Sequence, residues 1–155
     1  MKDYGNDLRV VFHHNPLPMH NRAQPAAQAS EAAGKQGKFW EMHDKIFENS
    51  KELTDENFAK WAEELGLNAE QFKKDMEDPE IKKKIADQQK LGTSLGARGT
   101  PAFFINGRYL SGAQPVEAFK AVVDEEMKKA DALIAKGTPK NKVYEETIKN
   151  GKTAP

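Results

Sequence analysis

The chain of 155 residues contains no cysteine. Without a thiol, this polypeptide can form no disulfide, no thiolate metal site and no thiol nucleophile of its own. Long apolar runs are also missing, since no stretch approaches the ~18 residues that span a bilayer. Neither sign of charge is in excess, because lysine plus arginine and aspartate plus glutamate number 24 each. A balanced charge gives no field that attracts nucleic acid, so we expect neither a nucleic-acid nor a membrane partner.

An export signal is the next missing feature. Met1–Asp7 has no apolar core of the kind that a signal peptide requires, so the compartment stays open. What the chain does have is 37% hydrophobic and 31% charged residues, with 8 Phe, 2 Trp and 3 Tyr as anchors. A chain of this length fits one domain that buries ~68–70% of its unfolded surface. We therefore expect a folded, helix-rich and strongly charged protein.

Apolar periodicity predicts a strand, a run of helices, a hairpin and a last helix. The β-branched and aromatic run Leu8–Phe12 predicts the strand. Pro25 is expected at the first position of a helix, and Thr54 and Asn68 are expected to cap two later helices. The expected helices cover residues 25–33, 39–47, 55–65, 69–76, 79–95 and 115–134.

The pattern weakens from Gly137 onward. Residues 138–142 are typical of a linker, and Val143–Ile148 predicts one or two further helical turns. We expect the tail Lys149–Pro155 to be mobile. Residues 1–136 are thus expected to form the domain, with 137–155 as a partly flexible extension.

The most specific motif runs from Arg98 to Gly112. Asn106-Gly107 between two apolar runs is the strongest short-range hairpin signal, because both turn positions need a positive φ. Thr100-Pro101 opens the first of these runs and is a candidate cis peptide bond, since proline lowers the preference for the trans form.

Four segments in this order resemble the DsbA-like thiol-disulfide oxidoreductases, a family of the thioredoxin fold. They are Gly5–His20 with its Pro-Leu-Pro exit, Gly37–Phe47, the Gly-Thr-Pro hairpin and the helix after Pro115. Together they cover roughly residues 3–136. The resemblance implies an α/β thioredoxin-like fold of the DsbA type, with an inserted helical subdomain over about residues 22–96. It also implies a bacterial, exported protein.

The family works with a Cys-X-X-Cys pair, and this chain has none. The resemblance implies that the first strand, the cysteine pair and its helix would precede residue 1, so the domain is expected to be N-terminally truncated. The missing strand would lie between Leu8–Phe12 and Ala102–Ile105. Three arrangements would fill its place: the two strands pair directly, a second copy supplies a strand, or a separate polypeptide does. We favour a dimer or a rearranged sheet, because open apolar edges promote aggregation.

Two functions follow from the resemblance. The first is a module of a protein-disulfide oxidoreductase, with Gly99, Thr100 and Pro101 presenting backbone groups to an extended peptide or protein substrate. The second is a cysteine-less module that binds or scaffolds proteins, as a homodimer. No catalytic residue is assigned in this chain, so its status as an enzyme stays open, and no cofactor is expected. Arg98, just before this loop, is interpreted as a solvated charge.

The sequence gives weaker support to a metal site or a hydrolase active site. His13 or His14 could converge with His20 across the Pro16–Pro18 turn, but the spacing matches no common zinc pattern. Since His13 and His14 would point to opposite faces of a strand, a structural role is favoured for them, and also for His43. The serines Ser30, Ser50, Ser94 and Ser111 lie in no nucleophile-elbow sequence. We therefore predict no metal site and no serine nucleophile.

Overall fold

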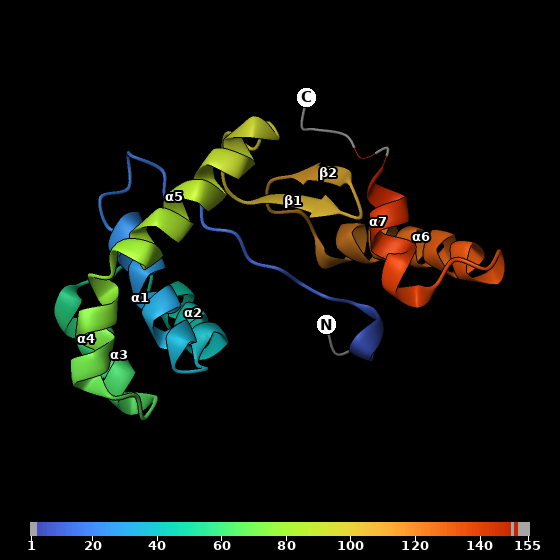
Figure 1. Ribbon diagram of the computed structural model, residues 1–155. Helices are drawn as coiled ribbons and strands as arrows, with labels where there is room; N and C mark the ends of the chain where they lie inside the picture. Colours follow the sequence, from blue (N-terminus) through green and yellow to red (C-terminus); the bar gives the residue numbers. More distant parts are fainter. Residues whose placement is uncertain (1–2, 150, 152–155) are drawn as a thin grey trace. The chain divides into compact units, whose positions relative to one another are not determined.

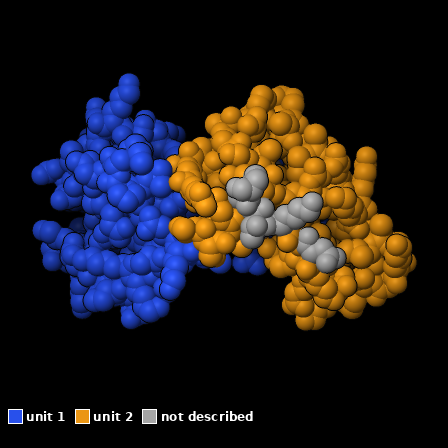
Figure 2. All heavy atoms as spheres, turned by 90° about the horizontal axis from the view of Figure 1, so that it is seen from above, with its two compact units in different colours: residues 1–91 blue, residues 92–155 orange. Residues whose placement is uncertain are grey.

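The computed structural model describes residues 3–149 and 151, and it divides the chain into two compact units (Figure 2). The first unit is Met1–Leu91 and the second is Gly92–Pro155. Most of the described residues are helical. The described part of the chain contains two strands, which form one small antiparallel sheet (Figure 1).

The first unit holds the helices of residues 23–91, which lie within the range expected for the inserted helical subdomain. They are α1 (Ala23–Lys35), α2 (Phe39–Glu48), α3 (Asp55–Glu64), α4 (Ala69–Met76) and α5 (Pro79–Ser94), preceded by a 3-10 turn at Gly5–Asp7. The last three residues of α5 belong to the second unit, so this helix continues across the boundary.

Capping residues fix where two of these helices begin. The Thr54 hydroxyl accepts from the Asn57 N–H at 3.2 Å, and the Asn68 side-chain oxygen accepts from the Gln71 N–H at 2.8 Å. Both bonds satisfy a donor that the first helical turn leaves unpaired, and both confirm the expected caps. Pro25 was expected at the first position of its helix, which is wrong: α1 begins at Ala23, and Pro25 is its third residue. Proline is still accommodated there because first-turn N–H groups have no helical partner.

The core of the first unit forms where α1 meets α2, α3 and α4. The small side chains of α1 let the large ones of the other helices pack closely against it. The fully buried members include Ala29, Ala32, Ala33, Met42, Phe58, Ala62 and Ile85. Leu91 of α5 lies outside this core and is 47% exposed.

Leu8–Phe12 does not form a strand, which corrects the expectation from its composition. Figure 1 draws the segment as an extended loop without a strand arrow, and Leu8 has β-type dihedral angles. The described sheet contains only β1 and β2. β-type residues need a hydrogen-bonded neighbour to become a strand, and this segment has none in the described part of its unit.

The second unit contains the expected hairpin and helix. Strand β1 (Ala102–Ile105) pairs antiparallel with β2 (Arg108–Ser111), and α6 (Val116–Ala135) follows. Asn106 and Gly107 form the turn with φ of 48° and 83°, as the Asn-Gly signal requires. A 3-10 turn (Lys140–Lys142) and α7 (Val143–Ile148) come next. In the expected mobile tail, residues 150 and 152–155 lie outside the described residues.

Candidate functional site

The Gly-Thr-Pro loop lies on the surface of the second unit. Gly99, Thr100 and Pro101 are all exposed, and the Thr100–Pro101 peptide bond is cis. The Gly112 N–H donates to the Pro101 carbonyl oxygen at 2.9 Å, which ties the loop to the end of the hairpin. The sequence-predicted site residues are therefore brought together, directly before β1.

One edge of β1 carries backbone groups that β2 does not use. In an antiparallel pair, opposed residues alternate between hydrogen-bonded and non-bonded pairs. The Gly112–Pro101 bond sets the phase of this alternation, and Phe103 then bonds to Leu110. The N–H and C=O groups of Ala102 and Phe104 consequently point away from β2.

Aromatic contacts hold the two faces of the hairpin. The Phe103 ring packs edge-on against Phe119 of α6 with centroids 4.7 Å apart. On the opposite face, Phe104 pairs with Tyr109 across the strands at 5.2 Å, and 36% of Phe104 is exposed. Phe103 and Phe104 are both 36% exposed, so each face of the hairpin presents aromatic surface beside the loop, and the Phe103 face also contacts α6.

Charged contacts fasten the turn end of the hairpin to α6. Arg108 bonds to Glu125 and lies 3.3 Å from the buried carboxylate of Glu126, which also accepts from Lys129 at 2.6 Å. The hydrogen bond from Arg108 lowers the pKa of Glu125 and Arg108's own pKa is raised by the same pair. These contacts keep β2, and through it β1, in a fixed position on α6.

The histidines do not form a metal centre. His14 is buried, His43 is half-buried among aromatic rings, and His13 and His20 are exposed. The part of the chain that the structure describes has no group of three or more His, Cys, Asp or Glu side chains suited to a metal ion. Of the candidate serines, Ser30 donates to the Ala27 carbonyl oxygen within α1, which is a structural contact.

A buried charged cluster in the first unit was not predicted from the sequence. The Glu31 carboxylate accepts from Lys84 Nζ at 2.6 Å and lies 3.3 Å from His14 Nε2. Burial raises the pKa of Glu31, but the close approach of His14 and the hydrogen bond from Lys84 outweigh this effect, and its pKa is lowered overall. The only sequence signal for this cluster is a lone carboxylate inside an alanine-rich helical run.

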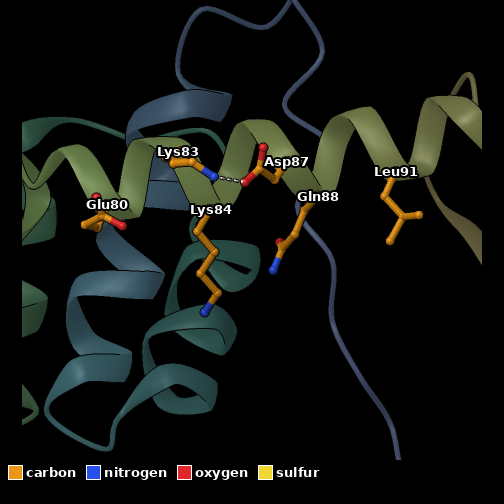
Figure 3. A pocket seen from close by; sticks show the side chains of 6 residues that line it. All are labelled: Glu80, Lys83, Lys84, Asp87, Gln88 and Leu91. Atoms are coloured by element: carbon orange, nitrogen blue, oxygen red, sulfur yellow. Dashed lines mark hydrogen bonds and ion pairs between the residues drawn. The ribbon is translucent and has the colours of Figure 1, made fainter.

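Helix α5 supplies the polar contacts that hold His14 in place. The Gln88 side-chain oxygen accepts from the His14 backbone N–H at 2.8 Å, and Gln89 donates to the Pro16 carbonyl oxygen at 2.7 Å. Figure 3 shows Lys84 and Gln88 extending from the same side of α5, one turn apart, beside a shallow hollow of about 370 Å³. Of the charged side chains along this hollow, Lys83 pairs with Asp87 and Lys84 pairs with Glu31.

Comparison with known families identifies the chain as a whole. The family model of the DSBA-like thioredoxin domain matches residues 1–124, which include the extended segment, the helices and the Gly-Thr-Pro hairpin. The chain belongs to the DSBA-like thioredoxin domain family. Within this family assignment, the cis-proline loop and hairpin are present and a cysteine pair is not.

The relatives of this DSBA-like domain are longer proteins. It is 39% identical over 124 residues to the Na(+)/H(+) antiporter NhaA 1 of Salinispora arenicola (strain CNS-205), covering 79% of this chain and 19% of that protein. It is 37% identical over 121 residues to the Na(+)/H(+) antiporter NhaA of Herminiimonas arsenicoxydans, covering 78% of this chain and again 19% of the relative. The chain therefore spans about a fifth of the length of these curated relatives.

No solved structure matches the chain at a significant level. Among the described residues, no helix is both long enough and apolar enough to cross a bilayer.

Proposed function

We propose that this chain is the substrate-binding part of a DsbA-like thiol-disulfide oxidoreductase module. It holds an extended peptide on the Gly99–Pro101 loop and, in this chain, on the adjoining edge of β1 that the resemblance assigns to the missing strand. The thiols of the reaction come from residues outside this sequence, because the chain contains no cysteine.

The observation that carries this proposal is the free edge of β1. The register leaves the N–H and C=O groups of Ala102 and Phe104 unused by β2, and the loop before them is exposed. An extended peptide can add to such an edge as a further strand, with its main chain supplying the hydrogen bonds. Recognition of this kind is largely independent of the peptide's sequence, which suits an enzyme that acts on many unfolded substrates.

The aromatic face beside this edge adds a preference for apolar residues. Phe104 and Tyr109 lie on the same face of the hairpin and are partly exposed. A peptide residue placed beside Phe104 would bury apolar surface at roughly 25 cal/mol per Å². We therefore expect peptides with apolar residues at alternate positions to bind more tightly than polar ones.

The chemical step itself is carried out by the thiols. A thiolate attacks one sulfur of a disulfide, a mixed disulfide forms, and the other sulfur leaves as a thiolate. The residues of this chain contribute only binding and orientation, since they hold the peptide near the loop. This separation of binding from chemistry makes the proposal testable without any redox activity.

Amide hydrogen exchange tests the binding site directly. In the free chain, the amides of Ala102 and Phe104 should exchange quickly, while those of Phe103 and Ile105 are protected by β2. An acetylated peptide of alternating threonine and valine should slow Ala102 and Phe104 by about tenfold or more, because they gain a hydrogen-bonded neighbour. Phe103 and Ile105 serve as internal controls.

A second peptide provides the matched control. Replacing every threonine and every valine by proline removes all the backbone donors needed for pairing in either register, so this peptide should leave all four amides unchanged. If the first peptide also leaves Ala102 and Phe104 unprotected at saturating concentration, the proposed site is wrong.

A further inference from the structure

The part of the second unit around the Gly99–Pro101 loop contains no acidic residue. Residues 92–116, from the end of α5 to the first residue of α6, include Arg98 and Arg108 but no aspartate or glutamate. The chain as a whole has 24 acidic and 24 basic residues, so a run of this length without a carboxylate departs from its balanced charge. The loop and the hairpin therefore carry positive charge and no negative charge of their own.

Of the two arginines, Arg108 is neutralised within its unit. It bonds to Glu125 and lies 3.3 Å from Glu126 Oε1. Arg98 is exposed, and it has no hydrogen-bond or ion-pair partner in the described part of the chain. This agrees with its interpretation as a solvated charge, and it leaves the N–H donors of the guanidinium available to a ligand.

The backbone on either side of Arg98 determines where this charge lies. Ala97 is buried and its N–H donates to the Gly92 carbonyl oxygen at 2.9 Å, so the chain is anchored directly before Arg98. On the other side, a Cβ added at Gly99 would meet no described atom within 4 Å. A peptide paired with an extended backbone lies about 4.8 Å from it, a distance that an arginine side chain can span. A peptide held on the loop therefore passes within reach of Arg98.

We propose that Arg98 selects peptides that carry an aspartate or a glutamate beside the segment held on the loop. This inference rests on the proposed function, because it names the substrate class of that same site. A carboxylate can accept two parallel N–H bonds from a guanidinium, which fixes its position as well as matching its charge. A lysine at the same place in the peptide is repelled, since residues 92–116 hold no carboxylate that could pair with it.

The size of this preference follows from the exposure of Arg98. A pair between exposed charges is partly screened by water and salt, so it changes an affinity by about two- to fivefold. Complementary charge contributes more to selectivity than to total affinity. The effect is therefore measured between peptides that differ only in charge.

Three such peptides test the preference. Each is an acetylated and amidated peptide of alternating threonine and valine, with glutamate, glutamine or lysine at both ends, so the result does not depend on the direction of the peptide. Isothermal titration calorimetry at low salt should show the glutamate peptide binding about two- to fivefold more tightly than the glutamine peptide, and the lysine peptide binding more weakly than either. At about 1 M salt, where charges are screened over about 3 Å, the three affinities should converge.

Substitutions of Arg98 assign the preference to its side chain. Arg98→Gln should remove the difference between the peptides, and Arg98→Glu should reverse their order. Lys136→Glu is the matched control, because it makes the same change of net charge in the same unit. Lys136 is exposed and follows the end of α6, whose 20 residues span about 30 Å. This variant should keep the order of the unmodified chain.

The outcomes separate this inference from the proposed function. Equal affinities of the three peptides, with Ala102 and Phe104 still protected from exchange, would overturn the role of Arg98 and leave peptide binding in place. A preference for the glutamate peptide that survives Arg98→Gln would also overturn it, since another group would then be responsible. If none of the peptides binds at saturating concentration, the proposed function and this inference are both wrong.

Discussion

At the scale of single residues, Glu31 is the least expected feature of the molecule. A carboxylate among alanines of a helix gives no sign of burial, yet Glu31 is 8% exposed and bonded to Lys84. Its partners come from positions 17 residues earlier and 53 later in the chain, which no local pattern could connect. The Gly99–Pro101 loop, in contrast, was predictable because its motif is contiguous.

The lowered pKa of Glu31 predicts a pH-dependent contribution to stability. The pKa of Glu31 is lower in the folded than in the unfolded chain. Its contribution to stability is therefore complete above about pH 4.5 and is lost as the pH falls below that value. Glu31→Gln should reduce the free energy of unfolding at pH 7 by about 1 kcal/mol or more. The difference between the two proteins should disappear in acid.

Urea unfolding between pH 3 and pH 7 measures this effect. Glu63→Gln, which changes an exposed carboxylate of α3, is the control and should match the unmodified chain throughout. A Glu31→Gln deficit that persists undiminished at pH 3 would show that shape rather than charge is responsible.

At the scale of elements, local signals predicted the helices and the hairpin, but not the fate of Leu8–Phe12. Thr54, Asn68 and Asn106-Gly107 act through hydrogen bonds or dihedral angles within a few residues, so the sequence contains the whole cause. A strand depends on a neighbour that the local sequence does not contain. The same composition therefore produces β1 where β2 is adjacent and an unpaired segment at residues 8–12.

Replacing either of two glycines of the second unit by alanine is expected to change stability in opposite directions. Gly107 has a φ of 83°, and an added Cβ would lie 2.9 Å from the Gly151 Cα. Gly107→Ala should therefore lower the free energy of unfolding by at least about 1–2 kcal/mol. Gly92 lies in α5, and an added Cβ there would make only an ordinary contact with Ala97. Gly92→Ala should therefore raise the free energy of unfolding by about 0.5–1 kcal/mol.

Thermal unfolding followed by the amide signals of β1 and β2 distinguishes the two variants. Equal midpoints for both would contradict the role assigned to the positive φ of the turn.

At the scale of the whole molecule, the chain contains a helical unit and a hairpin unit of a DSBA-like thioredoxin domain, without a cysteine. The family could be predicted because four motifs occur in order, and the match over residues 1–124 confirms it. The arrangement of the sheet could not be predicted, since each of the three ways to fill the gap satisfies the same sequence.

The absence of cysteine predicts that the chain alone has no disulfide reductase activity. Insulin reduction by dithiothreitol should proceed at the same rate with and without the chain, because no thiolate is available to attack. A turbidity assay with a Cys-X-X-Cys oxidoreductase as the positive control measures this. Any acceleration by the pure chain would contradict the assignment of binding without chemistry.

Helix α5 spans the boundary between the two units, and this determines where the chain can be divided into separate fragments. A cut at Leu91–Gly92 would leave the last helical turn without its carbonyl partners, so neither fragment would keep a complete terminus. Expression boundaries belong instead after Gly96, whose positive φ already ends the helix. A helical fragment ending there and a hairpin fragment starting at Ala97 would each retain whole elements.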